Sequence, residues 1–438
     1  MIKSEERYKC YVQILKDELV PAMGCTEPIA IAYAAAKARE TLGNIPDRVE
    51  LEVSGNIIKN VKSVIVPHTG GMRGIAAAAA AGIIAGDASK ELQVLAHVTK
   101  EQEAEMKEYE EKTPMKIIYS DNPAIFYLGV HCYYKDSHSF VEIKDRPRNI
   151  VRIEKDGEVL FDKSQEAELE EVKAASADCD NIKKLSEDRS CLTIAQIIDF
   201  AKTVDIEDVK ETLDRQIECN MAISAEGLRG DYGANVGKVL MKHYPDDIKT
   251  RAKASAAAGS DARMNGCEMP VVINSGSGNQ GMTTSIPVIV YARELGKTQE
   301  ELYRALVVSN LVTIHLKTGV GRLSAYCGAV SAGCGCGAGI AFLLGGGETE
   351  VAHTVVNALA MISGTVCDGA KASCAAKIAA AVEAGILGYY MYVEGQEFVG
   401  GDGLVLKGVE NTIENFGKLA SIGMVGTDKE IIRLMIGE

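Results

Sequence analysis

The chain has 438 residues, a formal net charge of −14, and only 5% aromatic residues with no tryptophan. This length suffices for two or more compact units, because single cores seldom grow beyond roughly 250 to 300 residues. The acidic balance excludes a general affinity for nucleic acid or for anionic membranes, since both require basic surface patches. Clustered alanine and glycine residues indicate helices that pack closely on small side chains.

The amino terminus is charged where a signal peptide needs an apolar stretch, so we expect a cytoplasmic protein. The most apolar runs, at 74–85 and 337–347, are too short and too rich in glycine to cross a bilayer. No membrane helix is therefore predicted. Because the cytoplasm keeps thiols reduced, each of the twelve cysteines is interpreted as either a small buried residue or a functional thiolate.

The amino-terminal region predicts two helices separated by a loop. Residues 5–19 have helical periodicity, and the loop AMGCTEP leads from there into the strong helix-forming run IAIAYAAAKARETLG. Cys25 is expected immediately before this second helix, where Thr26 is a suitable cap and Glu27 lies in the first turn.

From about residue 48 the apolar pattern changes to period two. VELEVSG and KSVIVPHTG are predicted as strands, joined by a connection rich in Asn and Lys and followed by an alanine-rich helix. LQVLAHV, a charged helix (EQEAEMKEYEEK), and the runs MKIIYSD, FYLGVHCYY, SFVEIKD and NIVRIEKDGEVLF then predict a strand, a helix and further strands. This series is typical of an α+β domain with a mostly antiparallel sheet, which we place at residues 46–165.

An acidic helix, SQEAELEEVKAASAD, is predicted next and is interpreted as a hinge. Strand patterns are few after it, and helices alternate with glycine-rich loops. The predicted fold class is therefore α+β, with a mainly α-helical domain (residues 1–45 and 166–438) and a smaller α/β domain with a mostly antiparallel sheet.

Three cysteines share one setting, a turn that leads into an apolar helix. They are Cys25 in MGCTEP, Cys327 in AYCGAV and Cys367 in TVCDGAK. A thiol near backbone N–H groups at the positive end of a helix has a lowered pKa, which supports metal ligation or nucleophilic chemistry.

Three further cysteines, Cys334, Cys336 and Cys374, extend the group in the carboxy-terminal half. Sites rich in thiolate and poor in nitrogen favour zinc or an iron-sulfur cluster. The absence of a C-x-x-C pair argues against a zinc ribbon or a ferredoxin run. The spacing alone leaves metal binding and simple core packing both open.

The loop INSGSGNQG, residues 273–281, combines flexible glycines with four polar side chains, those of Ser275, Ser277, Asn279 and Gln280. Its backbone can approach a ligand closely, and its donors suit a carboxylate or a phosphate. It matches neither a P-loop nor a dinucleotide-binding fingerprint. A purely structural turn is the alternative.

Other polar groups have both a functional and a structural interpretation. Arg263 can clamp a carboxylate or form an ordinary ion pair. His68 can be a general base or a surface residue, and Lys371 can transfer a proton or neutralise a nearby negative charge. Lys59, in the connection SGNIIKN, is a further candidate.

The motifs GCTEPIAIAYAAA, NSGSGNQG, GRLSAYCGAVSAGCG and GTVCDGAKASCAAKI together resemble the L-cysteine desulfidase family, which is related to the α chain of iron-sulfur L-serine dehydratases. The resemblance covers nearly the whole chain. It implies a 4Fe-4S cluster held by three cysteines, with one iron left open for the substrate. The matching residues are Cys25, Cys327 and Cys367, with Cys374 as the reserve ligand.

The resemblance implies a lyase that converts L-cysteine to pyruvate, ammonia and hydrogen sulfide without pyridoxal phosphate. The loop at 275–281 would hold the substrate carboxylate through Asn279 and Gln280, with Arg263 as second choice. The base that removes the α-proton stays open among three residues, Lys59, Lys371 and His68.

Several alternatives remain at this stage. They are L-serine dehydratase activity with the same cluster, a non-catalytic iron-sulfur protein that binds an amino acid, and a metal-free nucleophile at Cys25. The sequence departs from the dehydratase pattern in its extra cysteines at GCGCG and in its spacing after the CD motif, which puts serine dehydration in doubt. The expected partners are a small amino acid and, in a homodimer, a second copy of the chain.

Overall fold

The computed structural model describes residues 1–23, 26–122, 124, 126–145, 147–163, 189–244, 246–321 and 324–437. The predicted acidic helix SQEAELEEVKAASAD lies outside the described residues. The described chain divides into two compact units. We call them the helical unit (1–23, 189–367 and 372–428) and the sheet unit (26–163, 368–371 and 429–437).

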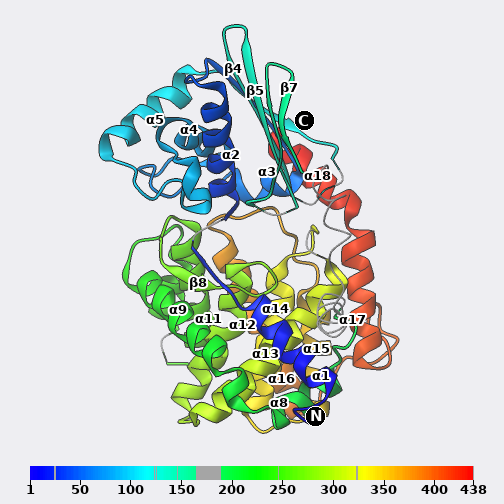
Figure 1. Ribbon diagram of the computed structural model, residues 1–438. Coiled ribbons are helices and arrows are strands. Elements are labelled where there is room, and N and C mark those ends of the chain that lie inside the picture. Colours follow the sequence, from blue (N-terminus) through cyan, green and yellow to red (C-terminus); the bar gives the residue numbers. More distant parts are fainter. Residues whose placement is uncertain are drawn as a thin grey trace. The chain divides into compact units, whose positions relative to one another are not determined.

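The helical unit begins with one helix and a short strand, and most of its helices follow after residue 189 (Figure 1). Its elements are α1 (Glu6–Glu18), β1 (Pro21–Met23), α8 (Ile194–Thr203), η2 (Ile206–Asp208), α9 (Lys210–Arg229), α10 (Val236–His243), α11 (Ile248–Met264), β8 (Pro270–Val272), α12 (Gly278–Glu294), α13 (Gln299–Val320), α14 (Gly328–Leu343), α15 (Glu348–Ile362), α16 (Cys374–Val393), α17 (Val409–Lys418) and the π-helical turn η3 (Leu419–Gly423). The final helix, α18 (Val425–Ile436), starts in this unit and ends in the other.

The sheet unit consists of α2 (Thr26–Leu42), β2 (Arg48–Val53), α3 (Gly55–Val61), α4 (Gly74–Ala85), η1 (Ala88–Gln93), α5 (Lys100–Lys112), β3 (Met115–Tyr119), β4 (Tyr127–Tyr134), β5 (Ser137–Lys144), β6 (Ile150–Lys155) and β7 (Glu158–Asp162).

The sheet has the strand order β3-β2-β4-β5-β6-β7, and β2 and β3 are its parallel pair. The other neighbours are antiparallel, with Val130 opposite both Leu51 and Val141. These apolar residues alternate with polar ones, and α2, α4 and α5 lie on one side of the sheet (Figure 1). The structure therefore confirms the predicted α+β class and the mostly antiparallel sheet.

Two predicted strands are wrong. In KSVIVPHTG the backbone hydrogen bonds of Val64 and Val66 join residues nearby in the chain, namely Val61, Met72 and Gly74. Ile65 forms an isolated bridge with Arg73. LQVLAHV begins in the 3₁₀-helix η1 and continues as turns. Both runs are short and apolar, and short apolar runs do not distinguish a strand from buried turns by periodicity.

The predicted boundary at residue 45 differs from the observed division, because α2 belongs to the sheet unit. Its alanines are fully buried in the same core as Leu51 and Val130. At Gly82 of α4 a Cβ atom would lie 2.1 Å from the Ala32 carbonyl oxygen, so α2 and α4 are in backbone contact. The second half of α18 also joins this unit by burying Ile432 in its core.

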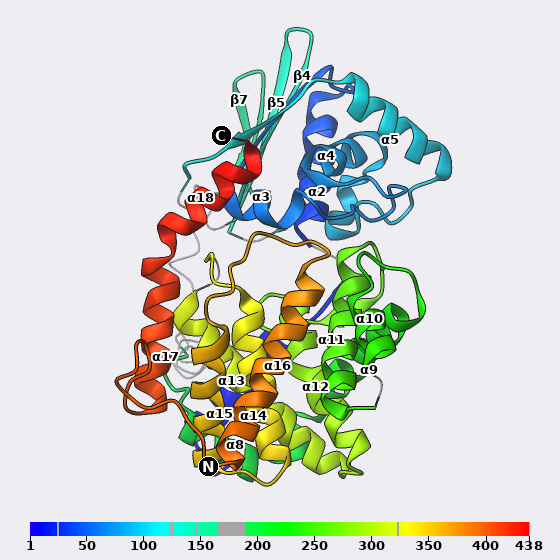
Figure 2. The ribbon, with the colours of Figure 1, turned by 180° about the vertical axis from the view of Figure 1, so that it is seen from behind.

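In the helical unit, α14 packs closely against its neighbours through glycine. A Cβ atom at Gly333 would lie 2.4 Å from the carbonyl oxygen of Ala381, and one at Gly337 would lie 2.5 Å from that of Gly385. Since both contacts advance by four residues along each helix, α14 and α16 run parallel. Figure 2 shows these helices from behind. The prediction of closely packed helices with small side chains is confirmed.

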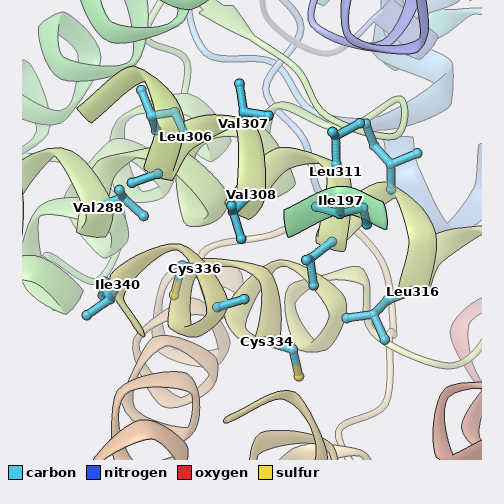
Figure 3. Packing of buried hydrophobic residues seen from close by; sticks show 14 of the residues in the cluster. Ile197, Val288, Leu306, Val307, Val308, Leu311, Leu316, Cys334, Cys336 and Ile340 are labelled. Carbon is cyan, nitrogen blue, oxygen red and sulfur yellow. The ribbon is translucent and has the colours of Figure 1, made fainter. Parts of the chain in front are cut away.

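Cys334 and Cys336, the cysteines of the GCGCG motif, face this core and are fully buried (Figure 3). Burial raises the pKa of both thiols. The motif therefore combines glycines for helix contact with cysteines as small core residues. Among the described residues, no helix is both long enough and apolar enough to span a membrane.

The close approach of α14 and α16 yields a stability prediction. We expect Gly337→Ala to lower the free energy of unfolding by about 1 to 3 kcal/mol, because the new methyl group overlaps backbone that cannot move independently. Gly426→Ala in α18 is the control, since no atom lies within 4 Å of a Cβ there. Urea denaturation followed by circular dichroism measures both. Equal stability of the two variants would contradict the packing described.

Candidate functional site

The two cysteines of AYCGAV and TVCDGAK lie on neighbouring segments of the helical unit. Tyr326 and Val366 form an antiparallel bridge, and the amide N–H of Cys327 donates to the Thr365 carbonyl at 3.1 Å. This pairing brings the thiols of Cys327 and Cys367 into hydrogen-bond contact. The predicted association of these two cysteines thus has a backbone cause.

Helix termini surround these thiols. Cys327 is the N-cap of α14, and Cys374 is the first residue of α16. The backbone N–H of Ala329 donates to the Cys327 sulfur, as is typical at the positive end of a helix. Cys327 is buried, whereas Cys367 and Cys374 are half-buried.

The ionisation of these thiols is mutually unfavourable. The pKa of the Cys327 thiol is raised well above its ordinary value, first by the hydrogen bond that it shares with Cys367 and then by burial. Cys374 raises it further, while the Ala329 amide acts in the opposite direction. Several thiolates can therefore coexist here only if a cation offsets their repulsion, as a metal centre does.

The glycine-rich loop forms a tight turn before α12. Ser275 and Gly276 have φ values of 49° and 78°, and Asn274 and Ser277 exchange backbone hydrogen bonds of 3.1 and 3.0 Å. Two left-handed residues in succession are the geometry of a type I′ turn. The Ser275 hydroxyl donates to the Asn274 side chain at 2.9 Å, and the Ser277 hydroxyl caps α12. Both predicted serines thus have structural roles in the turn.

Asn279 and Gln280 follow in the first turn of α12. Their side-chain oxygens are buried, and neither has a hydrogen-bond partner. Gln280 lies against the start of α14, since a Cβ atom at Gly328 would be 2.7 Å from its amide carbon. The structure therefore brings Gln280 close to the residue that follows Cys327. Buried amide oxygens without a partner are rare and mark places where a ligand can bind.

Arg263, at the end of α11, reaches the start of α12. A Cβ atom at Gly278 would lie 2.4 Å from its Nε atom, so the guanidinium group fills the space that this glycine leaves. Arg263 at the end of α11 and Gly328 at the start of α14 therefore both contact the first turn of α12, which carries the predicted carboxylate-binding residue Gln280.

A buried network of amides supports the turn, and sequence reasoning missed it. The Asn274 amide donates to the Asn310 side chain at 3.0 Å, and Asn310 exchanges hydrogen bonds of 2.8 and 3.0 Å with Gln216. All three residues are fully buried. Asn310 within the apolar run ALVVSNLVTIHL was the available signal, because a buried amide in such a run requires partners.

Lys59 lies in helix α3 of the sheet unit, where a strand connection had been expected. Its side chain is only 6% exposed. Its carbonyl oxygen accepts from the Ala370 amide at 3.2 Å, and a Cβ atom at Gly369 would lie 2.0 Å from the same oxygen. The backbone at position 369 also has a φ of 96°. Position 369 therefore requires glycine both because of this φ and because of the close carbonyl oxygen. The segment 368–371, which connects Cys367 toward Cys374 along the chain, is thus bound to α3.

The other two base candidates occupy different settings. Lys371 forms an ion pair with Asp368 and also donates to its carbonyl oxygen at 2.8 Å. His68 is exposed in the loop before α4, with a φ of 57°. Within the sheet unit, the structure brings Lys59 and Lys371 to the same short segment and leaves His68 on the surface.

Cys25 lies outside the described residues, so its role as a ligand stays a prediction. Glu27, two residues further on, accepts a hydrogen bond of 3.1 Å from Asn60 of α3. Asn60 also donates to Asn56 at 2.9 Å. These contacts fix the start of α2 relative to α3.

The chemistry of the donor set fits an iron-sulfur cluster. In the described part of the chain, no three His, Cys, Asp or Glu side chains are arranged to hold one metal ion. A cluster differs from a single ion because each iron binds its own thiolate. Cys327, Cys367 and Cys374 offer thiols alone, close to two helix N-termini.

Asp261 precedes Arg263 on α11 and is buried with a different partner. One of its carboxylate oxygens accepts from the Gly237 amide at 3.0 Å, at the start of α10, and the other has no partner. Burial raises the pKa of Asp261 to about 6, although the amides of Gly237 and Val236 partly offset this.

Sequence comparison matches residues 89–433 to the serine dehydratase alpha chain family. Relatives include UPF0597 proteins from Desulfitobacterium hafniense (58% identical over 100% of this chain and 99% of the relative), Lachnoclostridium phytofermentans (51%, 98% and 100%) and Treponema denticola (46%, 100% and 100%). The chain belongs to the serine dehydratase alpha chain family. The predicted relation to this family is confirmed, and the L-cysteine desulfidase activity stays a prediction.

Asp261 generates a pH prediction. Its native pKa of about 6 exceeds the ordinary value of 3.8. Between these two pH values the native state binds more protons than the unfolded state. The free energy of unfolding therefore falls as the pH rises through this range. Asp261→Asn keeps an acceptor for Gly237 but cannot titrate. We expect the stability difference between variant and wild type to shift by about 2 kcal/mol in favour of the variant from pH 4 to pH 7. Urea denaturation across this range measures it, and a constant difference would contradict the prediction.

Proposed function

We propose that this protein is an iron-sulfur lyase that converts L-cysteine and water to pyruvate, ammonia and hydrogen sulfide. The observation that carries the proposal is the hydrogen-bonded pair of thiols Cys327 and Cys367, with Cys374 close enough to act electrostatically on Cys327. Membership of the serine dehydratase alpha chain family supports a lyase acting on a small amino acid. A cytoplasmic location and a homodimer are part of the proposal.

The proposed cluster ligands are Cys327, Cys367 and Cys374. Cys374 is included because it acts electrostatically on Cys327, and Cys25, the ligand that the sequence predicts, is the alternative third ligand. When bound, a 4Fe-4S cluster with an open iron supplies a Lewis acid for the leaving group. The amide of Ala329 and the positive ends of α14 and α16 would offset the negative charge of the three thiolates.

The proposed amino-acid site is the start of α12. A zwitterionic substrate presents a carboxylate and an ammonium group, and the side-chain amides of Asn279 and Gln280 can each donate to the first and accept from the second. Their buried oxygens without partners support this role. Arg263 would add a positive charge for the carboxylate, together with the first backbone N–H groups of the helix.

Lys59 is the first candidate for the base that removes the α-proton. Its side chain is buried, and its backbone holds the segment between two proposed ligands. The ammonium group of Lys371 is engaged by Asp368, and His68 is exposed, so these two rank below it. Loss of the α-proton and of the β-substituent leaves an enamine, whose imine tautomer hydrolyses in water to pyruvate and ammonia.

L-Serine is the second candidate substrate, and the family match favours it. Both substrates share the carboxylate, the ammonium group and the α-proton, so the same residues would bind them. They differ in the leaving group, which is a thiolate in one case and a hydroxide in the other. Pyruvate formation from each, measured side by side on protein purified without oxygen, decides between the two activities.

Iron content tests the ligand assignment. We expect Cys327→Ala, Cys367→Ala and Cys374→Ala each to lose most of the iron, the acid-labile sulfide and the absorption near 400 nm, because each removes one thiolate of the set. Cys219→Ala is the matched control, since this half-buried cysteine of α9 should leave the cluster intact. Full iron content in Cys327→Ala or Cys367→Ala would falsify the cluster proposal. Loss of iron in Cys25→Ala but not in Cys374→Ala would instead make Cys25, Cys327 and Cys367 the ligands.

Steady-state kinetics test the base. We expect Lys59→Met to lower kcat by about 100-fold or more with unchanged iron content, because general-base catalysis is typically worth roughly 100- to 10,000-fold. Lys62→Met, at the exposed C-cap of the same helix, should retain kcat. If Lys59→Met keeps its kcat and its α-proton exchange with solvent, Lys371 becomes the leading candidate.

A further inference from the structure

A second pair of thiols lies in the helical unit on elements that contribute nothing to the proposed site. The sulfur atoms of Cys10, in α1, and Cys191, just before α8, are 3.5 Å apart. Cys10 is fully buried, whereas Cys191 is partly exposed. An oxidant in solution can therefore reach Cys191 first.

The two backbones are held together independently of the sulfur atoms. The Tyr11 hydroxyl donates to the Cys191 carbonyl oxygen at 2.8 Å, one residue from Cys10. Arg189 forms an ion pair with Glu18 at the other end of α1. A disulfide requires an S–S distance of about 2.05 Å, so closing the bond demands a small movement of side chains that are already adjacent.

We propose that Cys10 and Cys191 form a redox-active pair that peroxide converts to a disulfide. The Cys191 thiolate attacks the O–O bond of hydrogen peroxide, which forms the sulfenic acid and releases hydroxide. The Cys10 sulfur then attacks the Cys191 sulfur. The S–S bond forms, the S–O bond breaks, and the Cys10 proton leaves with the hydroxide as water. Overall, two thiols and one peroxide give one disulfide and two waters.

The assignment of roles follows from the environment of each thiol. The pKa of Cys10 is raised, first by its hydrogen bond with Cys191 and then by burial, so Cys10 is the resolving rather than the attacking residue. Disulfides in reducing compartments are mostly transient and redox-sensing, which fits a pair that closes only under oxidant.

The position of the pair in the chain indicates what the disulfide would do. The loop between Cys10 and Cys191 contains residues 26–163, the main part of the sheet unit. Closing it fixes α1 to the helical unit, and α1 leads directly into β1, whose partner β8 precedes the glycine-rich turn. The disulfide would thus hold the helical unit together under conditions that destroy an oxygen-labile cofactor. The chemistry of the pair does not depend on the proposed function, whereas this protective role rests on it.

Peptide mapping of the full-length protein tests the pair. Reduced protein is treated without oxygen with a small excess of hydrogen peroxide, alkylated, and digested with trypsin without reductant. We expect a linked species of CYVQILK (10–16) and SCLTIAQIIDFAK (190–202) that is absent before treatment and lost on reduction. Recovery of the two peptides as separate alkylated or sulfinic forms would overturn the proposal.

Thermal unfolding provides a second readout. We expect peroxide to raise Tm by roughly 5 °C and dithiothreitol to reverse the change, because a cross-link restricts the unfolded chain. Cys191→Ala should lose this increment, and so should Cys10→Ser, whereas Cys219→Ala should keep it. If the increment survives in both pair variants, a different cross-link is responsible and the assignment fails.

Discussion

The parallel packing of α14 and α16 is the constraint on which the candidate site depends. Gly333 and Gly337 allow α14 to contact the backbone of α16 at Ala381 and Gly385, and both helices advance together. Parallel neighbours place their amino-terminal ends at the same level. If the same pairing is followed back to the start of α14, Cys327 lies opposite the first turn of α16. Cys374 is located in this turn. A glycine pattern in the helix interiors thereby sets the spacing of two thiols about two turns away.

Parallel helices also create an electrostatic requirement. Two positive helix ends side by side repel each other unless negative charge lies close to them. The third helix, α12, contacts α14 at Gln280 near its start and at Val288 further along, so it runs in the same direction and adds a third amino-terminal end. Thiolates, a substrate carboxylate or both satisfy this requirement. The thiols alone do not, because Cys367, Cys374 and burial keep the pKa of Cys327 high. In the proposed function, a cofactor that binds thiolates and carries its own metal charge would resolve the conflict.

Much of the local structure could be predicted from the sequence, because periodicity and caps act over a few residues. The helix after Cys25 and the strands of FYLGVHCYY and SFVEIKD follow their patterns closely. KSVIVPHTG failed since its backbone pairs with a local turn, which an apolar pattern does not reveal. The individual site residues Cys327, Gln280 and Arg263 were visible as unusual chemistry at helix ends. Their convergence was not, because it depends on the tertiary contacts of Gly278 and Gly328. The buried amides of Gln216 and Asn310 likewise could not be assigned a role from the sequence, because each is the hydrogen-bond partner of the other.

The segment 368–371 lies between two proposed ligands along the chain and contacts α3. The chain leaves the helical unit after Cys367 and returns to it at residue 372, two positions before Cys374, and the four residues between are bound to α3. Gly369 permits this contact, since any side chain there would overlap the Lys59 carbonyl oxygen. The segment therefore joins α3 of the sheet unit along the chain to residues next to two proposed ligands. The constraint at position 369 is thus set by the α3 backbone, through the close Lys59 carbonyl oxygen and the φ of 96°.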